Sequence, residues 1–337
     1  MRALVLCRLE PGLDDAALVG ALDRIGVETM FLDDEKVAYP RWDGSIFLRV
    51  ARRLVRGEAR RTFNQRLCQM ADFMRPDALI VFGGAGLERS SVQYCQSLGA
   101  KIYFIYPDTT VNLPRVYTEL WNDAHSFTTK PNWNALANLL GVNGAPTFLY
   151  PWYDPQFRAD YPADKDQLSN DILFVGHASE AKRKAIEAVA ETFRDRFRMT
   201  VVGNGWSKLP QHVVNSGSGM YGGFVNSLYA KSAVTLGLLE DLGAGVHDVI
   251  TARTIQVPAY GGCLIHPRNS GSQALFGPAE FLFENTSDHS ELLDRVSIAL
   301  SDHAKRKTWA AAQWQAVRPH SVDSALETIL NPTRGTP

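Results

Sequence analysis

The chain has 337 residues and nearly balanced charge, with 35 lysines and arginines against 36 aspartates and glutamates. This balance argues against a dedicated nucleic-acid-binding protein, which usually carries a marked basic excess, and the 45% hydrophobic content excludes a disordered chain. No apolar run reaches the ~18–20 residues that span a bilayer, and residues 1–8 are too short and too soon charged for a secretory signal. The four dispersed cysteines lack zinc-ligand spacing. We therefore expect a cytoplasmic protein with reduced thiols.

Short apolar segments alternate with amphipathic helical segments along the first half of the chain, as in βαβ units built on a parallel sheet. The predicted strands are residues 3–7, 28–32, 78–82, 101–106 and 126–129, and the predicted helices are 14–25, 46–73, 91–98 and 134–140. Residues 150–167 then have the proline-rich, polar composition of a linker.

The same alternation restarts after this linker. The predicted strands are residues 171–176, 199–203, 234–238 and 263–266, and the predicted helices are 180–193, a short one ending at 231, 251–260 and 290–301. Two similar α/β domains are the result, in agreement with the two domains that the length predicts.

The most informative segment runs from Gly245 to Cys263. A glycine-containing loop leads into a helix predicted from Thr251, which stops at Gly261-Gly262 before a strand. A helix N-terminus presents backbone N–H groups and a partial positive charge, so it suits an anion such as a diphosphate. Arg253, near the first turn, would add a forked, charge-assisted donor. From these residues alone, an anion site and a purely structural turn are equally good interpretations.

Other candidates lie in the first half of the chain. Gly83–Gly86 follow a strand, where they suit either a close backbone approach to a ligand or a tight turn. Asp108 stands just beyond a strand's carboxyl end, where open α/β sheets bind ligands. It is interpreted as an acceptor contact, a general base or a turn residue. Glu88 and His125 are the other candidate bases, each with a structural role as the alternative.

The helix predicted at residues 46–73 is rich in arginine. Between its first and last arginine the only acidic residue is Glu58, and apolar residues are interspersed. The arginines are Arg49, Arg52, Arg53, Arg56, Arg60, Arg61 and Arg66. A cationic face beside an apolar one is typical of contact with a membrane surface or a lipid-linked acceptor, and a solvated face is the alternative.

Several short motifs occur in an order that resembles one family. They are Arg75-Pro76-Asp77, Tyr106-Pro107-Asp108, Leu149–Pro155, Asp171–Gly176, Gly203–Trp206 and the segment from Asp248 through Arg253 to Gly262. Their order and spacing, over residues 70–330, resemble the CgeB-like (spore-maturation-type, glycosyl transferases group 1) family of GT-B glycosyltransferases.

The resemblance implies a GT-B fold, in which two Rossmann-like parallel-sheet domains face a cleft. The first domain, residues 1–155, would bind the acceptor, and a linker at 156–170 would lead to the donor-binding domain at 171–305. Residues 306–337 would form a C-terminal helix that crosses back to the first domain.

The resemblance also implies roles for individual residues. Asp248 matches a carboxylate that contacts donor-sugar hydroxyls, and Gln256, eight residues later, matches a ribose-binding glutamate, from which this chain departs. An amide still bonds hydroxyls in both directions. The implied catalytic residues are Asp248, Arg253 and Lys182, and Asp108 is added to them as the candidate base because of its position after a strand. The implied donor-binding residues at the phosphates are Gly176, His177 and Arg183, with Thr251 at the diphosphate end. Phe224 and Val225 belong to the loop Gly222–Val225, whose backbone would read the nucleobase edge, and the remaining donor-binding residues are Gly203, His247 and Gln256.

The implied activity is that of a hexosyltransferase-type glycosyltransferase (EC 2.4) in glycan biosynthesis, with a UDP- or GDP-sugar as the favoured donor. The acceptor hydroxyl would belong to a saccharide, a lipid-linked glycan or a small molecule. No cofactor or metal is expected, because fixed donors and cations stabilise the leaving diphosphate. The protein would be cytoplasmic, with peripheral contact at the inner membrane face through Arg49–Arg66. Gln256 keeps open a non-catalytic GT-B-like nucleotide- or glycan-binding module, and a nucleotide-sugar epimerase of the same fold is the second alternative.

Overall fold

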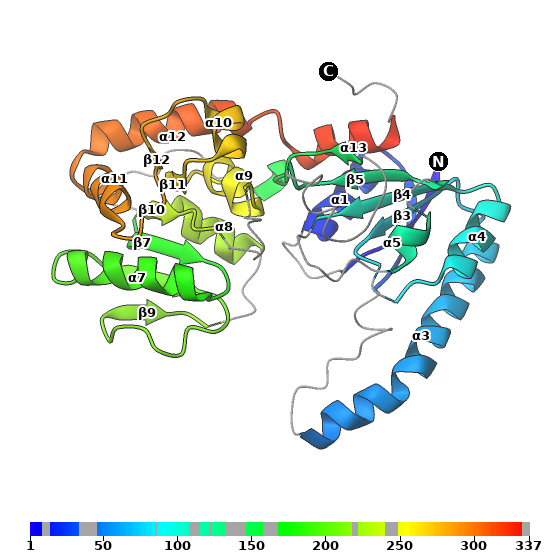
Figure 1. Ribbon diagram of the computed structural model, residues 1–337. Helices are drawn as coiled ribbons and strands as arrows, with labels where there is room; N and C mark the ends of the chain where they lie inside the picture. Colours follow the sequence, from blue (N-terminus) through cyan, green and yellow to red (C-terminus); the bar gives the residue numbers. More distant parts are fainter. Residues whose placement is uncertain are drawn as a thin grey trace. The chain divides into compact units, whose positions relative to one another are not determined.

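The structure, a computed structural model, describes residues 1–8, 14–33, 46–84, 86–107, 115–120, 123–131, 146–157, 168–217, 222–239 and 249–331. Within these ranges the side chains of residues 46–56, 115, 117 and 118 are not described. The chain divides into two compact units, one formed by residues 1–149 with 322–337 and the other by residues 150–321 (Figure 1).

Unit 1 is built on a parallel sheet with the strand order β2-β1-β3-β4-β5-β6. The strands are β1 (Arg2–Leu6), β2 (Glu28–Leu32), β3 (Ala78–Phe82), β4 (Lys101–Tyr106), β5 (His125–Thr128) and β6 (Thr147–Phe148). Its helices are α1 (Asp14–Arg24), α3 (Ile46–Met74), α4 (Arg89–Ser97), α5 (Arg115–Leu120) and α13 (Val322–Leu330). The central strands are almost fully buried, as expected for a parallel sheet covered on both faces.

Two helices of unit 1 pack against elements that are distant in the sequence. The C-terminal half of α3 buries Phe63, Leu67 and Ala71, which recur at helical spacing on one face. The last helix, α13, packs against α1, where Arg24 pairs with Asp323 at 2.7 Å.

Unit 2 repeats this plan with the strand order β12-β11-β10-β7-β8-β9, again with parallel neighbours throughout. The strands are β7 (Asn170–Val175), β8 (Met199–Val202), β9 (Val213–Asn215), β10 (Ser232–Leu236), β11 (Leu264–Pro267) and β12 (Leu282–Phe283). The helices are α7 (Glu180–Phe193), α8 (Gly223–Ala230), α9 (Ala252–Ala259), α10 (Ser270–Phe276), α11 (Ser290–Ser301) and α12 (His303–Val317), with a 3₁₀ turn, η2, at Pro155–Phe157.

Each sheet has a switch point, where the chain reverses the direction in which it adds strands. In unit 2 the strands β8 and β9 follow on one side of β7, and β10 to β12 follow on the other. Right-handed crossovers on the two sides of a switch point place their helices on opposite faces. The carboxyl ends of β7 and β10 therefore border a crevice of the kind in which open α/β sheets bind ligands.

The two parallel sheets with interleaved helices confirm the predicted α/β class. The short strands β6, β9 and β12 were not predicted, because two or three residues carry too little periodic signal. The helix expected at 134–140 lies outside the described residues. Pro258 lacks the N–H that would bond the carbonyl of Thr254, and α9 ends one residue later, at Ala259.

Candidate functional site

The predicted phosphate loop occupies the carboxyl edge of the unit-2 sheet. Gly176 directly follows β7, and its N–H donates to the carbonyl of Val202 at the end of β8, at 2.8 Å. His177 is exposed, and Ser179 caps α7 by accepting from the backbone N–H of Lys182 at 3.5 Å. An exposed imidazole therefore lies just before the N-terminus of α7. A helix N-terminus is a suitable environment for an anion.

The loop after β8 packs against the loop at residues 176–178, which is the predicted phosphate loop. Trp206 Nε1 donates to the carbonyl of Gly176 at 2.8 Å, and the N–H of Ala178 donates to the carbonyl of Asn204 at 2.9 Å. Gly203 has φ +140°, and a Cβ there would lie 2.6 Å from the carbonyl carbon of Gly176. The close packing of two backbone loops therefore explains the glycine and the tryptophan of the Gly203–Trp206 motif.

Because a backbone carbonyl has little room to move, Gly203→Ala should cost about 2 kcal/mol of unfolding free energy, through overpacking and positive-φ strain. Gly217→Ala is the matched control, since Gly217 has φ +82° but nothing within 4 Å of the added Cβ. The control should cost about 1 kcal/mol from strain alone. Urea denaturation measures both, and equal losses would show that space at Gly203 is not limiting.

The two basic residues predicted for phosphate differ in their surroundings. Arg183 Nη2 donates to the carbonyl of Gly205 at 3.0 Å, and the guanidinium lies 5.9 Å from the centre of the Trp206 ring. Lys182 is only 6% exposed. The guanidinium of Arg183 thus stabilises the loop after β8, in addition to any role toward a ligand.

Arg253 reaches from the first turn of α9 into the crevice at the switch point. Its Nη1 donates to the carbonyl of Val175 and its Nη2 donates to the carbonyl of Leu238 at 2.6 Å. The guanidinium lies 4.9 Å from the centre of the Phe174 ring. Val175 ends β7 and Leu238 lies two residues after β10, so the side chain joins the two strands that border the crevice.

The start of α9 is also held from β11, by a contact that the sequence reasoning missed. Thr251 and Gln256 are half-buried, whereas Thr254 between them is fully buried and lies 3.1 Å from Nε2 of His266. Burial, aided by the charge of Arg253, lowers the pKa of His266 to about 4. The only available signal was a histidine in an apolar strand, which usually indicates a structural residue.

The side chains of the predicted nucleobase loop, residues 222–225, differ in burial. Gly222 has φ +69° and precedes α8. Phe224, in the first turn, is 53% exposed, whereas Val225 is 7% exposed and packs with Leu173 and Val202. The role predicted for this loop belongs to its backbone, and of these two side chains only that of Phe224 is exposed enough to stack on a base.

Asp108, His247 and Asp248, three residues predicted in the site, lie outside the described residues. Of the alternative bases in unit 1, Glu88 pairs with Arg60 at 3.1 Å. His125 stacks on Tyr103, with ring centroids 5.2 Å apart, at the first residue of β5 and thus at the amino edge of the sheet.

The unit-1 switch point holds a buried carboxylate that the sequence analysis did not single out. Asp15, in the first turn of α1, is 1% exposed, and its carboxylate accepts from the backbone N–H of Arg8 at 2.8 Å. Burial is the largest influence on this carboxyl group and raises its pKa. Asp15 therefore ties α1 to the segment that leaves β1, while Gly83 and Gly84 follow β3 on the other side of the switch point.

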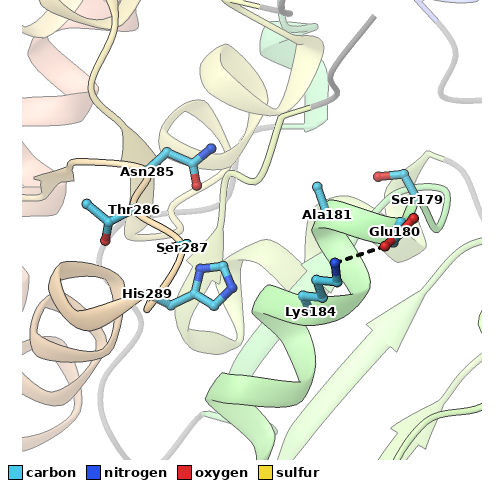
Figure 2. Close-up of a pocket in the computed structure, with 8 residues that line it drawn as sticks. All are labelled: Ser179, Glu180, Ala181, Lys184, Asn285, Thr286, Ser287 and His289. Atoms are coloured by element: carbon cyan, nitrogen blue, oxygen red, sulfur yellow. Dashed lines mark ion pairs between the residues drawn. The ribbon is translucent and has the colours of Figure 1, made fainter. Parts of the chain in front are cut away.

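A pocket of about 780 Å³ opens between the first turn of α7 and the segment after β12 (Figure 2). In Figure 2, His289 lies across the pocket from the start of α7, where the Lys184 ammonium points to Glu180 and pairs with it at 2.8 Å. Its lining consists of Ser179, Glu180, Ala181, Lys184, Asn285, Thr286, Ser287 and His289. The lining includes none of the residues predicted to bind the donor, although it shares the start of α7 with them.

The described part of the chain contains neither a candidate metal site nor a membrane-spanning helix. Those residues include no cluster of three or more histidine, cysteine, aspartate or glutamate side chains suited to a metal ion. Among the same residues, no helix combines the length and the apolar character needed to cross a membrane.

The second half of the chain resembles a known protein family. A family model described as glycosyl transferase-like matches residues 179–331, which include α7, α8 and α9. Among curated proteins, none matches the sequence.

Solved structures match the whole chain at low sequence identity. An E. coli structure described as trehalose-6-phosphate bound with UDP-2-fluoro glucose aligns over 100% of both chains, with 12% identity and a TM-score of 0.66. AviGT4, a glycosyltransferase involved in avilamycin A biosynthesis, aligns over 99% of this chain and 97% of its own, with 14% identity and a TM-score of 0.64. A Listeria monocytogenes protein named as a UDP-N-acetylglucosamine 2-epimerase covers 99% of this chain and 95% of its own, with 13% identity and a TM-score of 0.60. These likenesses confirm the predicted GT-B fold.

Proposed function

We propose that this protein is a glycosyltransferase that moves a sugar from a nucleoside diphosphate sugar to a hydroxyl acceptor. The observation that carries the proposal is the Arg253 guanidinium in the first turn of α9, which bonds the carbonyls of Val175 and Leu238 at the carboxyl ends of β7 and β10, beside the loop at Gly176. Both elements belong to unit 2, and the glycosyl transferase-like match covers α9 and begins at Ser179, directly after the loop.

In this proposal the donor lies along the carboxyl edge of the unit-2 sheet. Its diphosphate is bound by the loop at Gly176 and His177 and by the start of α9 at Thr251, and its base stacks on Phe224. Gln256 bonds the ribose, and Asp248 with His247 bonds the sugar. Lys182, Arg183 and Arg253 supply the cationic surroundings, and Gly203 with Val225 keeps the loops in place.

Charge separation explains why such a site suits this reaction. As the bond between the sugar and the diphosphate breaks, positive charge develops on the sugar and negative charge on the leaving diphosphate. Helix N-termini and fixed cations stabilise that negative charge without reorganising. Inversion at the sugar would need a base such as Asp108 to take the acceptor proton, whereas retention needs no protein base.

The donor class, the acceptor and the cellular setting rest on other observations. The neighbour bound with UDP-2-fluoro glucose favours a UDP-sugar, with a GDP-sugar as the alternative. The acceptor is a saccharide, a lipid-linked glycan or a small molecule, bound by unit 1, and the chain is a CgeB-like hexosyltransferase. Arg49–Arg66 would give peripheral contact with the inner membrane face, where the described Arg60 and Arg61 are exposed although each pairs with a glutamate.

Two observations favour other functions. Gln256, where the family resemblance implies glutamate, favours a non-catalytic binding module. The likeness to a protein named as an epimerase favours an epimerase of the same fold. Formation of an isomerised sugar from UDP-sugar without any acceptor would identify the epimerase, and turnover that appears only in Gln256→Glu would identify the module.

A panel of UDP, GDP, ADP, TDP and CMP, with and without magnesium, tests the proposal by thermal stabilisation. A ligand at ~100 times its dissociation constant should stabilise the protein by about 2.7 kcal/mol. We expect one nucleoside diphosphate to give a shift that does not depend on magnesium, because the site uses fixed cations.

Two neighbouring lysines of α7 locate the binding site. Lys182→Met should reduce the nucleotide-induced shift, whereas Lys184→Met is the control, since its ammonium pairs with Glu180 in the pocket of Figure 2. The reverse result would place the diphosphate in that pocket. No shift with any nucleotide would contradict the transferase proposal and leave the fold assignment intact.

A further inference from the structure

A buried hydrogen-bond chain links β11 to the first turn of α9. His266 on β11 and Thr254 on α9 are both 0% exposed. The Thr254 hydroxyl lies 3.1 Å from Nε2 of His266, and Nδ1 of the same ring lies 2.8 Å from the carbonyl oxygen of Pro267. The backbone N–H of Thr251, the residue before α9, donates to Thr254 Oγ1 at 3.1 Å.

The chemistry of these groups fixes the direction of every bond. A carbonyl oxygen only accepts, so the proton of the neutral imidazole lies on Nδ1, which donates to Pro267. Nε2 is then an acceptor, and the Thr254 hydroxyl must donate to it. Having given away its one proton, that hydroxyl accepts from Thr251, and all four groups are satisfied.

This hydrogen-bond chain ends at Thr251, which belongs to the proposed diphosphate site. Because the Thr254 hydroxyl can only accept from Thr251, it fixes the backbone N–H direction where α9 begins. The carbonyl of Thr251 accepts from the N–H of Thr254 at 2.9 Å, which closes the same turn from the other side. Arg253, between these two threonines, anchors the turn to the ends of β7 and β10.

The surroundings of the imidazole leave it little freedom. Gly237, directly after β10, packs so closely that an added Cβ would lie 2.8 Å from Cδ2 of His266. Absence of a side chain at this position makes room for the ring. A ring held this firmly transmits its position through Thr254 to the helix.

We propose that His266 is a positioning residue that, as a neutral imidazole protonated on Nδ1, sets the first turn of α9 through Thr254 for diphosphate binding. This inference rests on the proposed function, because it takes the start of α9 as the diphosphate site. Neither His266 nor Thr254 touches the ligand in this proposal.

The test combines an imidazole spectrum with nucleotide binding. In the full-length protein labelled with ¹⁵N-histidine, the ring signals of His266, assigned by their absence in His266→Gln, should show the Nδ1–H tautomer and no titration between pH 5.5 and 8. Thr254→Val removes the hydroxyl at constant shape and should weaken UDP or GDP binding about tenfold. Thr254→Ser restores the hydroxyl and should restore most of the affinity.

The outcomes separate this inference from the proposed function. An Nε2–H tautomer, or titration near neutral pH, would overturn the assigned hydrogen-bond chain whether or not a nucleotide binds. A folded Thr254→Val protein with wild-type affinity would overturn the positioning role. Failure of wild type to bind any nucleotide of the panel would instead overturn the proposed function, and with it the role of His266 in binding.

Discussion

Acidification from pH 7.5 to about 4 should lower the unfolding free energy of unit 2 by about 3 kcal/mol more in wild type than in His266→Gln. The reason is the buried imidazole, whose pKa burial lowers from 6.5 to about 4. In the unfolded chain the ring takes up a proton as the pH falls through 6.5, whereas in the folded protein it stays neutral until about pH 4. The unfolded state therefore binds more protons across this interval, and stability falls with pH.

Glutamine at position 266 is a suitable comparison because its side-chain oxygen can accept from Thr254 and does not titrate. Urea denaturation at several pH values, followed by the fluorescence of Trp152, Trp206, Trp309 and Trp314 in unit 2, measures the difference. Other titrating groups act equally on both proteins and cancel in the comparison. Parallel stability curves for the two proteins would contradict a neutral buried His266.

The fold was largely predictable because the central strands are apolar runs separated by helical segments. Residues 78–82 and 171–175 are examples, and both are strands at the centre of a sheet. The order of strands was not predictable from periodicity, since pairing joins residues far apart in the chain. The switch point between β7 and β10 thus became visible only in the structure.

The candidate site stays a prediction, and the sequence indicated its segments better than the surroundings of its side chains. The resemblance indicated the loop at Gly176 and the start of α9, and both lie at the carboxyl edge of one sheet. The loop Gly222–Val225 was predicted to read the nucleobase with its backbone, and that prediction did not reveal that the Val225 side chain lies in the core, where the apolar face of α8 is buried. His266 has no local sequence signal, since its partner Thr254 stands twelve residues earlier on another element.

Arg253 has two candidate roles, binding of the diphosphate and anchoring of α9 to β7 and β10. Sequence reasoning assigned it to the diphosphate, and the structure shows its guanidinium on the carbonyls of Val175, 78 residues away, and Leu238. Both contacts depend on strands meeting at the switch point, so no short motif contains them. The two roles make different predictions for a lysine in its place.

Arg253→Lys should cost about 3 kcal/mol of unfolding free energy and weaken nucleoside diphosphate binding at least tenfold. A lysine keeps the charge, but a single ammonium cannot reproduce the planar fork that joins two carbonyls and stacks on Phe174. The first turn of α9 would then lose its anchor to β7 and β10. Urea denaturation gives the stability, and calorimetric titration, at a temperature where near-UV circular dichroism shows a folded protein, gives the affinity.

Arg183→Lys is the matched control, because its guanidinium donates to one carbonyl, that of Gly205, and lies over one ring. It should cost about 1 kcal/mol. If Arg253→Lys lost stability but bound the nucleotide as well as wild type, its charge would be what the diphosphate requires, and anchoring of α9 would be irrelevant to binding. Loss of both affinity and stability, despite the retained charge, would show that diphosphate binding depends on the geometry of the first turn of α9. Arg253 and His266 both hold that turn in place.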